Sequence, residues 1–140
     1  MKSVKLHIVS VTKNDEGESR LERWEQAKMA KKNGKYYAFY QESGEGMENV
    51  KTTLKWDAET VVINRSGGVE NRQEFRQGVT TASVYKTPYL QIPLGVKTNK
   101  LVTGLADGKH RLEIEYLLSH GDAPYGEMKI LMELEEQDEH

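Results

Sequence analysis

The sequence predicts an all-β protein of about eight to ten antiparallel strands, folded as a sandwich or a barrel. Three observations support this class. Asn33-Gly34 and Asp107-Gly108 are flanked by strand-like sequence. They predict two-residue hairpin turns, because Asn, Asp and Gly tolerate the positive φ that both central positions of such turns require. Apolar and polar residues alternate along several segments, as in strands with one buried face. Turn-forming residues recur at short intervals, and no helical pattern is interleaved with them. A length of 140 residues predicts a single domain, residues 1–140.

The first strand is expected within residues 1–15. Lys5, His7 and Ser10 interrupt its apolar residues, so this segment lacks the long apolar region and the small-residue cleavage site of a signal peptide. No window of the sequence approaches the 18 consecutive apolar residues that a transmembrane helix needs. We therefore expect an intracellular, cytoplasmic protein that is not associated with a membrane.

Residues 19–32 give two conflicting signals. The segment is rich in helix formers, and Leu21 and Trp24 stand at helical spacing. The tight Asn33-Gly34 turn directly after it requires an extended approach, and residues 35–40, which follow the turn, are rich in strand-forming aromatic residues. Because helix propensity is the weaker signal, we expect a strand here.

Several later strands follow from alternation with a period of two. Apart from Thr52, apolar side chains occupy every second position of residues 50–56, 90–96, 112–118 and 128–134. Pro93 falls on the outward row of its segment, and a proline cannot donate to a ladder, so we expect a bulge or a strand edge near it. The outward charges of the last two segments are spaced to pair across neighbouring strands.

Clusters of Gly, Asn, Asp and Ser punctuate these segments. Besides the two hairpin turns, we expect turns at residues 14–17, 43–46, 57–59, 66–68, 78 and 121–124. The last residues, 135–140, are acidic and polar, and we expect them to form a frayed tail.

The centre of the chain resembles a known family. Val50-Lys51-Thr52-Thr53 is followed in order by Ile63-Asn64-Arg65-Ser66-Gly67, Arg72-Gln73-Glu74-Phe75 and Thr87-Pro88-Tyr89. This order of motifs, over about residues 50–98, resembles the YwiB-like family of bacterial proteins of unknown function. Members of that family are similar to calycins, the lipocalin-like class of meander barrels. The resemblance therefore implies a closed antiparallel meander barrel instead of a sandwich, and it implies no established activity.

The segment after residue 60 carries the candidate site. If Val61 and Ile63 face inward, alternation turns Arg65 inward as well, and on the return strand Asn71 and Gln73 share the inward row. Burying a guanidinium and two amides costs free energy unless partners satisfy them. The partner is either an anionic or polar ligand, held by the arginine, or an internal network with Glu or Tyr side chains.

The register of this return strand decides which residues point inward. Alternating charges at residues 70, 72, 74 and 76 form the complementary, solvated row, but a single bulge between residues 68 and 72 would turn Arg72 inward instead. Two aromatic residues near the cluster complete the candidate set. The expected ligand-binding residues are Arg65, Asn71, Arg72, Gln73, Phe75 and Tyr89.

The composition argues against several functional classes. The chain has no cysteine, and its four histidines show no ligand spacing, so we expect neither a metal site nor a cofactor. No serine lies in a nucleophile elbow, and no pair of carboxylates is placed for acid–base chemistry, so we expect no enzyme. With 20 Lys plus Arg against 22 Asp plus Glu, the net charge of −2 predicts no nucleic-acid partner.

Two functions remain open from the sequence. The first is a barrel that binds a small amphipathic or anionic molecule in its interior. The alternative is a structural or regulatory interaction protein with a solid core, whose outer face around Tyr37 and Phe39 docks a partner or a second copy. The chain is accordingly expected to be a monomer or a homodimer.

Overall fold

In the computed structural model, which describes residues 1–42 and 47–137, ten strands form one closed antiparallel barrel. The predicted turn at residues 43–46 and the last residues of the predicted tail, 138–140, lie outside the described residues. In chain order the strands are β1 (Lys2–Asn14), β2 (Gly17–Lys32), β3 (Lys35–Gln41), β4 (Val50–Trp56), β5 (Thr60–Gly67), β6 (Glu70–Arg76), β7 (Thr80–Lys86), β8 (Gln91–Ala106), β9 (Lys109–His120) and β10 (Ala123–Glu136).

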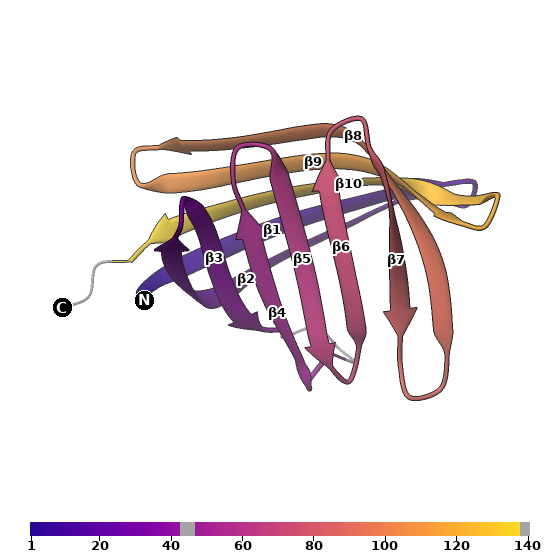
Figure 1. Ribbon diagram of the computed structural model, residues 1–140, viewed down its shortest axis with the longest axis horizontal. Coiled ribbons are helices and arrows are strands. Elements are labelled where there is room, and N and C mark those ends of the chain that lie inside the picture. The colour runs from indigo at the N-terminus through magenta and orange to yellow at the C-terminus, as the bar shows by residue number, and fades with distance from the viewer. Residues whose placement is uncertain (43–46, 138–140) are drawn as a thin grey trace.

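Each strand pairs with its sequence neighbours, and β1 closes the barrel by pairing with β10 from Val4↔Glu136 to Lys13↔Glu127. The predicted meander barrel is therefore confirmed. Strands β1, β2, β8, β9 and β10 have 12 to 16 residues, whereas β3 to β7 have seven or eight. Figure 1 shows the long strands running across the back of the molecule and the short strands crossing in front of them.

The predicted hairpin turns are present. Asn33 and Asp107 have φ of 53° and 54°, and the glycines that follow them also have positive φ. This left-handed backbone at both central residues matches the right-handed twist of the flanking strands. Residues 19–32 belong to β2, so the turn chemistry and the pairing with β1 and β3 prevail over the helix propensity of that segment.

Alternation places one row of each strand inside the barrel. Leu6, Leu54, Ile63, Leu112 and Leu134 have no exposed surface, and they belong to one cluster of buried side chains that draws on nine of the strands. On the outside, Arg111 Nη1 on β9 lies 3.0 Å from Glu133 Oε1 on β10. This is the expected pairing of outward charges across neighbouring strands. The middle of the barrel is thus filled with packed side chains.

Two details refine the expected strand boundaries. Pro93 lies in the first part of β8, which pairs with β7 but begins to pair with β9 only at Gly95, so the proline is at a local edge. The bulge of this strand lies elsewhere, between Thr98 and Lys100. Residues 135 and 136 belong to β10 and pair with β1, so the tail is not frayed at these two positions.

The meander gives the barrel two distinct ends. The turns β1–β2, β5–β6, β7–β8 and β9–β10 lie at one end, which we call the Arg65 end. The turns β2–β3, β4–β5, β6–β7 and β8–β9 lie at the other, which we call the His110 end, together with the start of β1 and the finish of β10. The search for a helix that could span a membrane finds none in residues 1–42 and 47–137.

Candidate functional site

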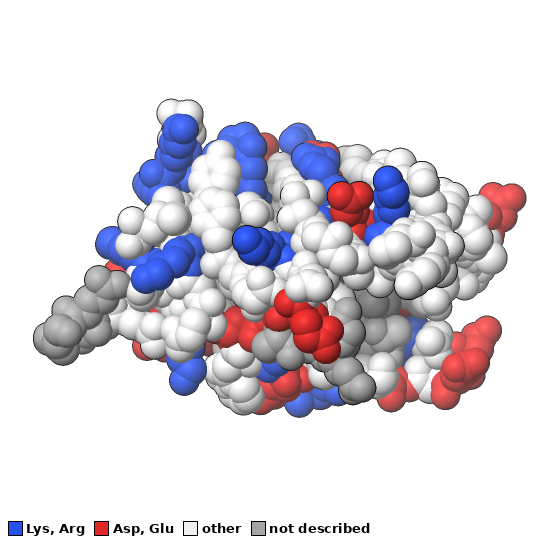
Figure 2. Space-filling model, turned by 90° about the horizontal axis from the view of Figure 1, so that it is seen from below, with Lys and Arg blue, Asp and Glu red and all other residues white. Residues whose placement is uncertain are grey.

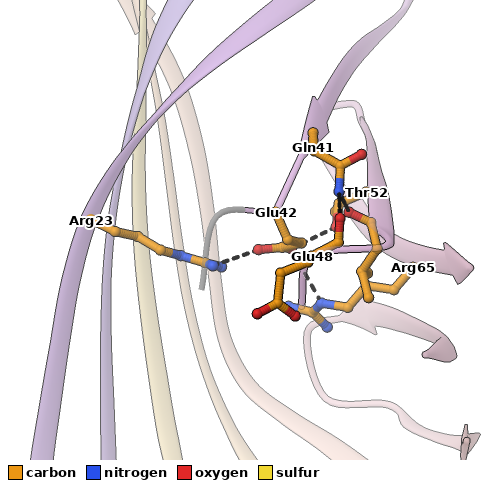
Figure 3. A network of polar contacts seen from close by, with 7 residues as sticks. Arg23, Gln41, Glu42, Glu48, Thr52 and Arg65 are labelled. Atoms are coloured by element: carbon orange, nitrogen blue, oxygen red, sulfur yellow. Dashed lines mark hydrogen bonds and ion pairs between the residues drawn. The ribbon is translucent and has the colours of Figure 1, made fainter. Parts of the chain in front are cut away.

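A buried carboxylate organises the interior of the Arg65 end. Glu42 follows β3, and its side chain has no exposed surface. Arg23 Nη1 lies 2.5 Å from Glu42 Oε2, Thr52 Oγ1 donates to Glu42 Oε1 at 2.6 Å, and Arg65 Nε lies 3.5 Å from Oε1. Figure 3 shows the four side chains converging from β2, the end of β3, β4 and β5. They form a polar layer beneath the apolar core, and we call it the Glu42 network.

The alternation of the strands positions these side chains. Glu42 continues the inward row of Ala38 and Tyr40, and Arg65 continues the row of Val61 and Ile63. The Glu42 amide donates to the Val50 carbonyl at 2.9 Å, which extends the β3–β4 pairing beyond the strand.

Close backbone contact fixes the β5–β6 turn next to this network. Gly67 has φ of 111°, and a Cβ at this position would lie 1.9 Å from the Asn49 carbonyl oxygen. The same oxygen accepts a hydrogen bond from the Gly68 amide at 3.1 Å. Only glycine fits at residue 67, so the Ser66-Gly67-Gly68 turn holds the end of β5 against the approach to β4.

The charges of the network act on two buried tyrosines. Burial raises the pKa of Tyr40, the Glu42 carboxylate raises it further, and the guanidinium groups of Arg65 and Arg23 lower it. Burial raises the pKa of Tyr116 to about 12, and Arg65 again lowers it. Both phenols therefore stay protonated at neutral pH. The positive charge of Arg65 acts on both tyrosines inside the barrel, because it lowers the pKa of each.

The seam between β6 and β7 is open over most of its length. The two strands have seven residues each but pair only at Glu70↔Lys86 and Asn71↔Tyr85. Side chains replace the missing ladder: Asn71 Nδ2 donates to Ser83 Oγ at 2.9 Å and to the Val84 carbonyl at 3.0 Å, and Ser83 Oγ donates to the Arg72 carbonyl at 2.7 Å. These bonds satisfy main-chain carbonyls that the splayed strands leave free.

A hollow of about 520 Å³ lies where this seam opens, and we call it the seam hollow. Its lining comes from the last part of β5, the first part of β6, and the middle and end of β7. These are residues 64–66, 70–72, 82–84 and 86. The side chains of Arg65, Arg72 and Lys86 supply positive charge there, and Glu70 supplies negative charge. Figure 2 views the molecule from below, and Lys and Arg are more frequent in the upper half of that view than in the lower half.

The structure places the six predicted site residues in three different settings. Arg65, Asn71 and Arg72 line the seam hollow, with Arg65 partly buried and the Arg72 side chain 60% exposed on the outer row. Gln73 and Phe75 face the interior, where Phe75 packs on Tyr116 with ring centroids 4.8 Å apart. Tyr89 is 94% exposed at the β7–β8 turn. The register is therefore the one without a bulge, and Arg65 is the inward arginine.

Two members of the Glu42 network were missed from the sequence. Glu42 could have been found, because it extends the inward row of β3 by one step. Arg23 offered no such signal, because the inward row of β2 begins with exposed Leu21 and continues with Arg23 and Glu25 before the first apolar core residue, Ala27. An internal network with a Glu side chain was one of the two partners expected for Arg65, and Glu42 is such a partner.

The outer face predicted around Tyr37 and Phe39 carries two stacked rings. Their centroids lie 6.5 Å apart at an interplanar angle of 7°, and Phe39 is 40% exposed. Lys55 Nζ lies 5.7 Å from the Tyr37 ring centroid. The interaction surface there remains a prediction. Across residues 1–42 and 47–137, no group of three or more His, Cys, Asp or Glu is placed to hold a metal ion.

Comparison with known proteins finds the same fold and related sequences. A family model described as a domain of unknown function, DUF1934, matches residues 6–132. The uncharacterized beta-barrel protein YwiB of Bacillus subtilis (strain 168) is 31% identical over 120 residues, which cover 85% of this chain and 83% of that protein. The crystal structure of the ywiB protein from Bacillus subtilis has a TM-score of 0.87 at 26% identity, covering 98% of this chain and 93% of that chain.

Proposed function

This chain belongs to the DUF1934 family, in agreement with its resemblance to YwiB-like proteins, and we propose that it is a barrel that binds a small anionic molecule in the seam hollow. The observation that supports this function is the approach of Arg65, Arg72 and Lys86 to one hollow of about 520 Å³. That volume is in the range of small-molecule sites.

The available donors of Arg65 favour an anion. Its contact with Glu42 is made through Nε, and this is its only polar contact within the residues that the structure describes. The two terminal amino groups of the guanidinium, which bind carboxylates and phosphates through paired hydrogen bonds, are therefore available. The Glu42 contact orients the side chain, so an anion would meet an arginine that is already held in place.

The side chains that line the seam hollow carry more positive than negative charge, which favours an anionic ligand. In the described residues, Arg72 pairs with the partly exposed carboxylate of Glu74 at 3.6 Å, and Lys86 pairs with that of Glu70 at 3.9 Å. Such exposed pairs contribute little and are readily exchanged for a ligand. Because packed side chains fill the middle of the barrel, a binding site at its rim is better supported than one in its lumen.

The test is a titration with inorganic phosphate at constant ionic strength, followed by the amide chemical shifts of the protein. We expect the largest changes at residues 64–66, 70–72 and 82–86, with saturation. Arg72→Gln should weaken phosphate binding by about tenfold, since a charge-assisted hydrogen bond contributes roughly 1.5 kcal/mol or more. Arg111→Gln is the matched control, because its side chain is 54% exposed and also faces one carboxylate.

Two results would overturn the proposal. One is a set of shift changes spread evenly over the basic residues, without saturation. The other is equal phosphate affinity in the Arg72→Gln and Arg111→Gln variants. A third variant, Arg65→Met, should abolish binding while the spectrum still shows a folded barrel; unchanged phosphate affinity in that folded variant would also contradict the proposed role of Arg65.

A further inference from the structure

A second hollow, of about 580 Å³, lies at the His110 end of the barrel, and we call it the His110 hollow. It is lined by the last inward residues of β2, the start of β3 and the β8–β9 hairpin, including Met29, Lys31, Tyr36, Leu105 and His110. In Figure 1 this is the side where the β8–β9 hairpin projects beside the two marked chain ends. It is separate from the seam hollow, which lies at the other end.

His110 is an unpaired polar group in the wall of this hollow. The residue is only 4% exposed, and its ring contacts are aromatic: Tyr36 at 4.5 Å and Trp56 at 5.6 Å between centroids. Within residues 1–42 and 47–137 its imidazole makes no hydrogen bond, and its ring nitrogens retain some exposed surface. Because this imidazole lines the hollow and its nitrogens are not fully enclosed, it is available to bind a polar group of a ligand there.

Of the two aromatic rings packed around His110, Tyr36 lines the hollow and Trp56 is buried behind it. Tyr36 stacks on Trp56 with centroids 5.5 Å apart and an interplanar angle of 21°, and His110 meets both rings edge-on. Leu105, which also lines the hollow, is 57% exposed, although it lies on the inward row of β8. An aromatic ring placed there would cover Leu105 and pack on Tyr36 in the offset or edge-to-face manner of aromatic pairs.

One cation at the rim has no carboxylate partner. Lys31 Nζ lies 5.2 Å from the Tyr36 ring centroid and has no ion pair in the described part of the chain. The other two charged side chains lining the hollow pair with each other, since Lys2 Nζ lies 3.2 Å from Glu136 Oε1. The hollow therefore combines the ring of Tyr36 with a lysine side chain that has no ion pair in the described part of the chain.

From these observations we infer that the His110 hollow binds a small aromatic carboxylate. Its ring lies on Tyr36 beside Leu105, its carboxylate meets Lys31, and a polar substituent or carboxylate oxygen meets the imidazole of His110. This site does not depend on the proposed function of the seam hollow, because the two share no residue.

The experiment compares three probes of related size: 2-naphthoate, the uncharged 2-naphthamide and the non-aromatic decanoate. Binding is measured by calorimetry and located by amide shifts on the whole protein. We expect 2-naphthoate to bind most tightly and to shift residues 29–31, 36 and 105–110. Lys31→Gln should weaken it by about fivefold, the effect of one partly exposed charge pair. Leu105→Asp should weaken it by tenfold or more.

Each variant has a neighbour as its matched control. Lys32→Gln changes the next lysine, on the outward row of β2, and Val102→Asp changes an exposed outward residue of β8. Both controls should bind 2-naphthoate like the wild type. The inference fails if Lys31→Gln and Lys32→Gln have equal affinity, if 2-naphthamide or decanoate binds as tightly as 2-naphthoate, or if the shifts appear at residues 64–72 instead. Phosphate binding at the seam hollow is unaffected by any of these outcomes.

Discussion

Glu42→Gln is the sharpest perturbation of the buried network, because it removes one charge and leaves the shape of the side chain. In the wild type the carboxylate is fully buried and meets Arg23 at 2.5 Å, Arg65 at 3.5 Å and the Thr52 hydroxyl at 2.6 Å. The amide keeps one oxygen for Thr52, but two guanidinium groups then face each other without the charge that holds them together.

The structure sets the size of the effect. Removing one partner of a fully buried ion pair costs about 3–5 kcal/mol, because the remaining charge stays desolvated. Here both arginine side chains retain 21% exposure, so water still screens part of their charge. We therefore expect the free energy of unfolding to fall by about 2–3 kcal/mol, which lowers Tm by about 10 °C in a domain of this size.

Urea unfolding followed by tryptophan fluorescence measures this loss, with Glu74→Gln as the control. Glu74 pairs with Arg72 at 3.6 Å, but the two side chains are 36% and 60% exposed, so this substitution should cost less than about 0.5 kcal/mol. In ~1 M NaCl, where the screening length is about 3 Å, the difference between the variants should persist. Equal stability of Glu42→Gln and Glu74→Gln would refute the argument that burial makes the Glu42 network stabilising.

Three other predictions concern stability. Thr98→Val should stabilise the protein by about 1 kcal/mol, because the fully buried Thr98 hydroxyl has no hydrogen-bond partner in the described part of the chain; the same change at Thr52 should destabilise it, and urea midpoints that move in one direction would contradict this. Gly67→Ala should lower Tm strongly and Gly68→Ala only slightly, since the first Cβ would lie 1.9 Å from a carbonyl oxygen and the second contacts nothing closer than 3.8 Å. Burial lowers the pKa of His110 from its usual value of 6.5, although the Glu136 carboxylate opposes this shift and Lys31 adds to it. The unfolded chain therefore binds more protons, and stability should decline as pH falls from about 6.5; His110→Gln should flatten that decline, and an unchanged pH profile would refute it.

Local sequence signals predicted the strands because each depends on neighbouring residues. The Asn33-Gly34 turn fixed the path on both of its sides, and alternation in residues 50–56 identified the inward row without knowledge of any partner strand. Closure of the barrel depends on pairing between β1 and β10, more than a hundred residues apart. No local pattern carries that information, so it came from the family resemblance.

The candidate site was only partly predictable for the same reason. Alternation from Ile63 placed Arg65 inward. Its partner Glu42 directly follows β3, and β4 lies between β3 and β5. Arg23 could not be identified from the sequence, because its segment has a composition that favours a helix. The inward row of β2 is also polar toward the Arg65 end. A buried charge demands a partner, so the sequence predicted that one exists, but its identity depends on register across three strands.

The two ends of the barrel are closed by different kinds of side chain, and the packed apolar core lies between them. At the Arg65 end the interior is closed by charges that satisfy one another around Glu42. At the His110 end it is closed by Trp56, Tyr36 and an imidazole without a hydrogen bond in the described residues. Because the packed core separates them, a ligand at one end has no open path to the other. Binding of phosphate and of 2-naphthoate should consequently be independent, and a titration of one probe in the presence of the other should return unchanged affinities.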